Sequence, residues 1–108
     1  MDEDQRKSPR RSLDVKVNFA FDAIAHTAQS KDISKGGICL ITDKPLEEGK
    51  MLSLRFTIPG SDEPVDLHGK VMWSRPSGEY HHENGMSFWR VDSDTEQKLV
   101  EYLQESPL

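Results

Sequence analysis

The sequence contains a single cysteine, Cys39, so no internal disulfide can form, and its apolar neighbours indicate a buried thiol. No apolar run approaches the roughly 20 residues needed to span a bilayer. The opening stretch, MDEDQRKSPRR, is charged with no apolar segment behind it, so we expect no secretory signal and no membrane contact. These absences favour a cytoplasmic location.

Apolar residues are also in short supply. They make up 34% of the 108 positions, while charged residues make up 31%. A chain of this length forms one domain with a modest core. No internal repeat, low-complexity segment or linker divides it, so we expect a single domain with an ionic surface.

Positive charge is scarce outside one segment. The net charge is −5, yet residues 6–11 read RKSPRR and hold four positive charges, which leaves −9 for the rest of the chain. Nucleic-acid binders usually spread Lys and Arg over a face, and the acidic surroundings would repel a long polyanion. A small anion fits better than a nucleic acid polymer, although a solvated or polyanion-binding tail remains an alternative.

Alternation of apolar and polar residues predicts strands along most of the chain. The stretches are 13–21, 23–34, 36–43, 51–60, 65–75 and 85–91, with 76–84 as a loop. In the stretch 65–75, Trp73 is in phase with Val71 and so falls on the apolar side. Antiparallel strands of this length protect their edges most simply by closing into a small barrel.

The periodicity changes near the C-terminus. Ser93 and Glu96 have the spacing of a capping box, and Leu99 and Leu103 lie at helical spacing. We therefore expect a flexible basic arm (1–12), a six-stranded antiparallel β-barrel (13–92) and a C-terminal α-helix (93–105) packed on or near it.

The segment KDISKGGI, residues 31–38, can carry chemistry. In an extended backbone, Asp32 and Ser34 would point at one ligand, and Gly36 and Gly37 would let the main chain approach closely. The same residues also form ordinary turns with side-chain-to-backbone hydrogen bonds. From this segment alone, both interpretations stay open.

Two spaced motifs together resemble a known family. Arg6 and Arg10 form R-x-x-x-R, and Asp32, Ser34 and Gly37 form D-x-S-x-x-G. This pair, at the head of a small barrel sequence, resembles the PilZ domain, whose members are bacterial receptors for the second messenger cyclic di-GMP. The resemblance covers nearly the whole chain.

The resemblance implies a ligand site. Arg6 and Arg10 would grip guanine edges and phosphates, since a guanidinium fork matches the guanine acceptors O6 and N7. Asp32 would accept from the guanine N1–H and N2–H₂ groups, Ser34 would add a hydrogen bond, and Gly37 would leave room for the base.

Secondary candidates are Arg11, Gly36 and Trp73. Arg11 would reach a phosphate or remain a solvated charge. Gly36 precedes the motif glycine in the same turn. In some family members an aromatic residue lies beside the nucleotide at the place of Trp73, whereas a Trp in an alternating strand is more often core.

Other constellations are weaker. The triplet His81, His82, Glu83 invites a metal site, but neighbouring strand residues point to opposite sides, and a solvated loop is the favoured interpretation. Cys39 has no partner base, so the sequence does not support nucleophilic catalysis. We expect no metal, no cofactor and no enzymatic activity.

We therefore expect a cyclic di-GMP receptor, monomeric or weakly dimeric, that orders its arm on ligand binding and signals through a partner protein. The alternative is a PilZ-like interaction protein that binds no nucleotide.

Overall fold

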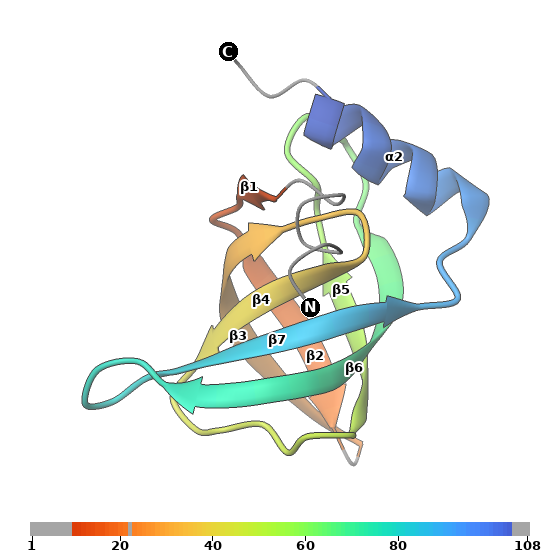
Figure 1. Cartoon of the computed structure of the whole chain (residues 1–108). Helices are drawn as coiled ribbons and strands as arrows, with labels where there is room; N and C mark the ends of the chain where they lie inside the picture. Colours follow the sequence, from red (N-terminus) through yellow and green to blue (C-terminus); the bar gives the residue numbers. More distant parts are fainter. Residues whose placement is uncertain (1–9, 22, 105–108) are drawn as a thin grey trace.

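The computed structural model describes residues 10–21 and 23–104. Seven strands and one helix follow one another in this part of the chain (Figure 1). They are β1 (Arg11–Ser12), β2 (Lys16–Phe21), β3 (Ile24–Ile33), β4 (Gly37–Thr42), β5 (Met51–Phe56), β6 (Val65–Pro76), β7 (His82–Trp89) and α2 (Ser93–Gln104).

Six of the strands close into a barrel. They follow the order β3-β2-β5-β6-β7-β4, and β4 pairs back onto β3, so every edge of the ring is hydrogen-bonded. All pairings are antiparallel. The predicted six-stranded barrel with a C-terminal helix is thus confirmed, with β1 as an extra strand on the end of β3.

The sequence predicted one strand from residue 13, but the structure has β1 and β2 with an irregular step between them. The buried hydroxyl of Ser30 bridges this step. It accepts from the Val15 amide (2.9 Å) and donates to the Leu13 carbonyl (2.6 Å). A side chain therefore replaces the missing ladder hydrogen bonds.

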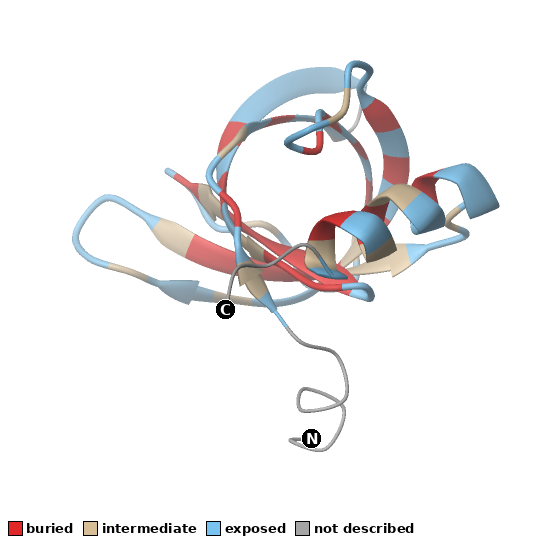
Figure 2. Ribbon diagram, turned by 90° about the horizontal axis from the view of Figure 1, so that it is seen from above, coloured by how far each residue is buried: buried red, intermediate tan, exposed pale blue. Residues whose placement is uncertain are grey.

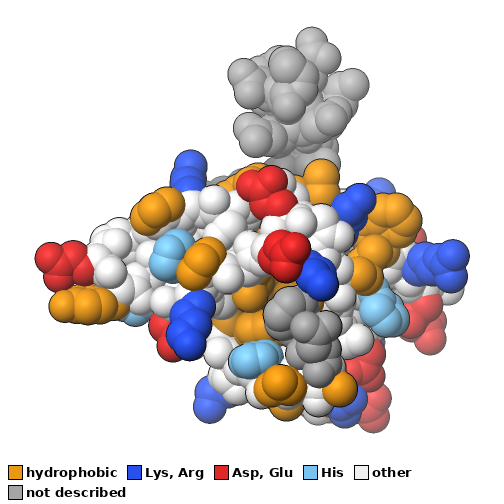
Figure 3. Space-filling model, turned by 90° about the horizontal axis from the view of Figure 1, so that it is seen from below, with side chains coloured by type: hydrophobic (Ala, Val, Ile, Leu, Met, Phe, Trp, Pro, Cys, Tyr) orange, Lys and Arg blue, Asp and Glu red, His pale blue; other side chains and the backbone are white. Residues whose placement is uncertain are grey.

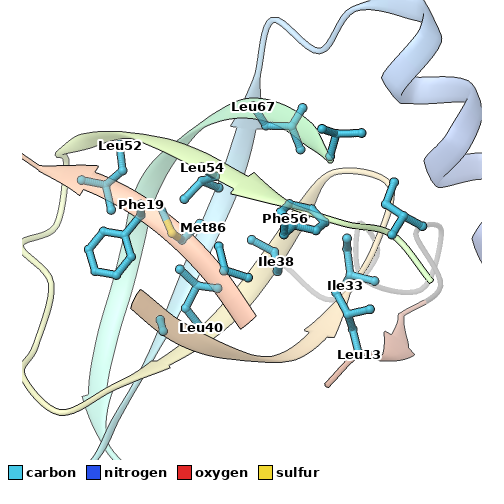
Figure 4. Close-up of a cluster of buried hydrophobic side chains, with 14 of the residues drawn as sticks. Leu13, Phe19, Ile33, Ile38, Leu40, Leu52, Leu54, Phe56, Leu67 and Met86 are labelled. Carbon is cyan, nitrogen blue, oxygen red and sulfur yellow. The ribbon is translucent and has the colours of Figure 1, made fainter. Parts of the chain in front are cut away.

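The barrel interior holds the core. Burial alternates along β5 and the first half of β6, whereas β4 is buried along nearly its whole length. Figure 2 shows the buried residues from the end of the barrel that carries α2. Leu54 and Phe56 of β5, Ile38 of β4 and Met86 of β7 point toward the interior (Figure 4). This closed apolar interior is what fixes the position of residues on the outer surface.

Two β-bulges interrupt the alternation. Register shifts between Ser30 and Asp32 in β3, and between Val71 and Trp73 in β6, each leave one unpaired residue, Lys31 or Met72. A bulge reverses the facing of the residues that follow it. Trp73 is therefore outside the barrel and 38% exposed, so its predicted place in phase with Val71 was wrong.

The last barrel strand begins earlier than predicted. The sequence indicated a loop over 76–84, but β7 begins at His82, and both Glu83 and Asn84 are buried. The solvated loop expected for the HHE triplet was therefore wrong, because β6 and β7 form a long hairpin that extends to the pair Pro76 and His82.

The helix α2 lies at one end of the barrel, near β1 (Figure 1). Leu99 and Tyr102 are its buried core residues. Its N-cap is Asp92, whose carboxylate accepts from the Thr95 amide at 2.7 Å, and not Ser93 as the capping-box pattern predicted. Within the described ranges, no helix is both long and apolar enough to cross a bilayer.

Candidate functional site

Arg10 brings the predicted motif residues together. Its Nε atom lies 3.0 Å and its Nη2 atom 2.8 Å from Oδ1 of Asp32. Its Nη1 atom donates to Oγ of Ser34 at 3.4 Å. One guanidinium therefore contacts both side chains of the D-x-S segment, although Arg10 lies 22 positions before Asp32 and 24 before Ser34 in sequence.

The segment after β3 is a turn that also shapes this contact. The Ser34 amide donates to the Gly37 carbonyl at 2.8 Å, and the Gly36 amide donates to Oγ of Ser34 at 3.3 Å. The turn interpretation is thus confirmed, and the turn orients the Ser34 hydroxyl that Arg10 contacts. The ligand-binding interpretation stays a prediction.

The two glycines have different surroundings. A Cβ atom on Gly37 would lie 2.1 Å from the Met86 carbonyl oxygen, so only glycine lets β4 approach β7 here. A Cβ atom on Gly36 would meet nothing within 4 Å. In this structure Gly37 acts through strand packing, and Gly36 faces open space.

A cavity of about 280 Å³ lies beside the Arg10–Asp32 pair on the outer face of the barrel. Most of its walls come from strands β3, β4, β6 and β7. The two bulges turn Asp32 and Trp73 outward, and both side chains therefore line the cavity. The lining residues are Arg10, Lys31, Asp32, Cys39, Met72, Trp73, Arg75, Glu83, Gly85 and Met86.

The indole of Trp73 lies over Gly85 on the neighbouring strand. A Cβ atom on Gly85 would be 2.2 Å from Cε2 of Trp73, so the glycine makes room for the ring. The cavity thus has an exposed aromatic wall, and Trp73 is placed beside Asp32 rather than in the core.

Not every predicted residue is in the cavity. Arg11 points to α2 instead, where its guanidinium lies 4.0 Å from the Tyr102 ring centroid and donates to the Tyr102 carbonyl. Arg6 lies outside the described residues. The structure therefore brings Arg10, Asp32, Ser34 and Trp73 to one place, and it holds Arg11 elsewhere.

Sequence reasoning missed a charged cluster in the far wall. Glu83 accepts from Lys31 Nζ at 2.8 Å, from Arg75 Nη2 at 3.2 Å and from Ser77 Oγ at 3.2 Å. The hydrogen bonds from Lys31 and Arg75 lower the pKa of Glu83, and Glu83 raises the pKa of Lys31. The sequence held one indication of this cluster: Trp73 and Arg75 are two apart on one strand, so their side chains face the same side.

The cavity suits binding of an anion that also carries N–H donors. Arg10, Lys31 and Arg75 offer donors, while Asp32 offers an acceptor. Burial raises the pKa of the Cys39 thiol, which disfavours the nucleophilic thiolate. In the described part of the chain, no group of three or more His, Cys, Asp and Glu residues is arranged to hold a metal ion.

A second hollow, of about 430 Å³, lies at the barrel end opposite α2 (Figure 3). Its walls include the apolar Phe19, Leu46 and Leu52 together with residues of the loop after β4. None of the predicted site residues lines it. Of the predicted site residues, Arg10, Asp32 and Trp73 line the smaller cavity.

Comparisons with known proteins agree with this fold. The family model described as the PilZ domain matches residues 4–105. No curated protein sequence matches the chain.

Solved structures of low sequence identity share the fold. The Bacillus subtilis inhibitor of motility, MotI/DgrA, superposes with a TM-score of 0.79 at 16% identity, over 95% of this chain and 54% of that one. MrkH of K. pneumonia, in complex with c-di-GMP, gives 0.77 at 18% identity, over 94% and 52%. The Escherichia coli YcgR PilZ domain with c-di-GMP gives 0.70 at 17%, over 92% and 88%. The chain thus spans about half the length of the first two structures.

Proposed function

Because this chain belongs to the PilZ domain family and its Arg10 joins Asp32 to Ser34 at the edge of a cavity, we propose that it is a receptor for cyclic di-GMP. The contact of one arginine with both side chains of the second motif is the observation that carries the proposal. The MrkH and YcgR structures, which share the fold, contain that ligand.

The chemistry of the cavity matches the ligand. Cyclic di-GMP carries two phosphates and two guanines, and guanine presents acceptors on one edge and N–H donors on another. The carboxylate of Asp32 complements the donor edge, while the guanidinium of Arg10 complements the acceptors or a phosphate. Three cationic and two anionic side chains line the cavity, which leaves it positive toward a dianion.

Arg10 would have to move when the ligand binds. Its Nε and Nη2 atoms both contact Oδ1 of Asp32. A guanine that pairs with Asp32 through N1–H and N2–H₂ needs both carboxylate oxygens, so it competes with Arg10. Because 41% of the Arg10 side chain is exposed, the guanidinium can turn from Asp32 to the ligand.

The response to the ligand follows from this competition. We propose that cyclic di-GMP orders the part of the N-terminal arm before Arg10 across the barrel, since Arg11 and Ser12 are already paired with β3 without ligand, and that the new surface binds a partner protein. The role is binding rather than catalysis. Hydrogen exchange of peptides from residues 1–12, with and without cyclic di-GMP, measures the ordering.

Titration calorimetry tests the receptor proposal. We expect cyclic di-GMP to bind the wild type, and Arg10→Ala and Asp32→Ala each to weaken binding at least about tenfold, since a bidentate base contact contributes roughly 1–3 kcal/mol. Arg55→Ala is the matched control, because Arg55 is an exposed strand arginine paired with Asp66 away from the cavity. No binding by the wild type, or full binding by both variants, would contradict the proposal.

Exchange of arginine for lysine separates the alternatives. A polyanion-binding tail tolerates Arg6→Lys and Arg10→Lys, because it depends on charge and salt. A guanine fork does not, because lysine lacks the fork. Absence of nucleotide binding together with a stable fold would favour the alternative of a PilZ-like interaction protein.

A further inference from the structure

Besides Arg10, two cationic side chains that belong to neither sequence motif, Lys31 and Arg75, line the cavity. Glu83 of β7 is only 9% exposed, and it holds Lys31 of β3 and Arg75 of β6 by the contacts described above. Lys31 reaches Glu83 across the intervening strand β4. A single buried carboxylate thus fixes two cations from two strands on one side of the cavity.

The guanidinium of Arg75 is held in a defined place. Its Nη2 atom contacts Glu83, and its Cζ atom lies 4.9 Å from the centroid of the Trp73 ring. Among the described residues, its Nε and Nη1 atoms have no hydrogen-bond partner. Glu83 therefore orients one edge of the Arg75 guanidinium, and Trp73 stacks on one of its faces. The Nε–H and Nη1–H groups remain available to a ligand.

A role in sheet stability alone explains this arrangement poorly. Two thirds of the Arg75 side chain is exposed (66%), and exposed ion pairs contribute little to stability. The Trp73 ring on which it stacks is also exposed. An orientation that adds little to the fold is what a preorganised ligand contact requires.

We propose that Arg75 is a third guanidinium of the ligand site, binding the guanine acceptor edge on the side of the cavity away from Arg10, and that Glu83 is its positioning residue. The inference rests on the proposed receptor function. It adds a pair of residues on β6 and β7 that lie outside both sequence motifs. The planar fork suits O6 and N7 of guanine, and the Trp73 ring on which it stacks limits its orientation.

The sign of one substitution separates positioning from simple charge. Glu83→Gln removes a negative charge from the cavity, so electrostatics alone predicts tighter binding of a dianion. If Glu83 acts by holding Arg75, the same substitution weakens binding, because the guanidinium loses its anchor. The two explanations therefore predict opposite changes in affinity.

Titration of the full chain with cyclic di-GMP tests the contact. We expect Arg75→Ala and Arg75→Lys each to lower affinity about tenfold or more, because lysine keeps the charge and loses the fork. The matched control Arg55→Lys, at another exposed strand arginine paired with a carboxylate, leaves affinity unchanged. Wild-type affinity in Arg75→Lys would overturn the guanidinium contact.

The positioning role needs its own variants. We expect Glu83→Gln to weaken binding several-fold, and the double variant Arg75→Ala with Glu83→Gln to bind no more weakly than Arg75→Ala alone. Glu79→Gln, an exposed loop glutamate outside the cavity lining, is the control for charge. Unchanged or tighter binding by Glu83→Gln, or an equal loss in both backgrounds, would overturn the role of Glu83.

The failure of this inference differs from the failure of the receptor function. If binding requires Arg10 and Asp32 but not Arg75, only the role proposed for Arg75 and Glu83 is overturned. If the wild type does not bind cyclic di-GMP, both are overturned. Thermal unfolding of each ligand-free variant shows whether a lost affinity reflects a lost fold.

Discussion

Asn84 is a fully buried amide with hydrogen bonds at both ends. Its Oδ1 atom accepts from the Leu46 amide (3.1 Å) and from Ser74 Oγ (2.7 Å). Its Nδ2 atom donates to the Leu40 carbonyl (3.1 Å) and to Thr42 Oγ1 (2.9 Å). One side chain thus joins β4 and β6 to the loop that follows β4.

Asn84→Ala should therefore be costly. The substitution removes the acceptor of the Leu46 amide and the side-chain donor to the Leu40 carbonyl. Each unsatisfied buried group costs roughly 1–3 kcal/mol. We expect urea unfolding to show a loss of about 2–4 kcal/mol. Asn18→Ala, at an exposed asparagine that contacts Thr27, should change stability by less than about 0.5 kcal/mol. Equal effects of the two substitutions would contradict this account.

Single residues of the site differ in how far the sequence revealed them. Asp32, Ser34 and Arg10 were predictable because motif spacing is independent of the exact strand register. Glu83 was not, because its neighbours His81 and His82 gave the segment the polar composition of a loop. Its burial follows from the length of the β6–β7 hairpin, which alternation alone does not define.

At the scale of elements, the bulges decided what the sequence could predict. Alternation gave the facing of residues correctly in β5 and in β6 as far as Val71. The unpaired Met72 cannot be told from an ordinary strand residue in the sequence. Trp73 is equally compatible with core and surface, so nothing in the composition signals the change of facing. The Lys31 bulge has the same effect on Asp32. The outward direction of Asp32 and Trp73 therefore depends on how β3 and β6 pair with strands that are distant in sequence.

The start of α2 gives a test at this scale. Asp92 accepts from the Thr95 amide, which lowers the pKa of Asp92 below its ordinary value near 3.8. Asp92→Ala removes the cap, and we expect the melting temperature at pH 7 to fall by roughly 4–8 °C. Ser93→Ala, at the residue favoured by the capping-box pattern, should have little effect. A larger loss for Ser93→Ala would contradict the assignment of the cap.

The same cap gives a dependence on pH with a definite sign. Because the pKa of Asp92 is lower in the folded state than in the unfolded chain, its contribution is present above about pH 3.8 and disappears as pH falls through the folded value. The difference in melting temperature between wild type and Asp92→Ala should therefore shrink on acidification below that pH. A constant difference from pH 7 to pH 2.5 would show that the carboxylate charge contributes nothing.

At the scale of the whole molecule, α2 contacts both segments that form the site. Arg11, next to Arg10 in sequence, packs on Tyr102, and the Tyr102 hydroxyl donates to the Ser12 carbonyl at 3.3 Å. From the other side, Lys35 of the D-x-S-x-x-G turn lies 3.8 Å from Glu96. The end of the barrel thus connects the arm, the turn and the helix. Movement of Arg10 toward a ligand would be transmitted to α2 through its neighbour in sequence.

This connection predicts a change in α2 that can be measured without a partner protein. With saturating cyclic di-GMP, we expect amide hydrogen exchange in α2 of the wild type to change, because ligand binding redirects Arg10 while Arg11 remains attached to Tyr102. In Arg11→Ala the ligand should still change exchange around Asp32, but the effect on α2 should fall to less than about half, since the attachment is lost. Arg55→Ala, whose ion pair with Asp66 joins β5 to β6 outside the cavity lining, should keep the wild-type response. An α2 response that is undiminished in Arg11→Ala would show that the helix senses the ligand through the turn at Lys35, and not through the arm.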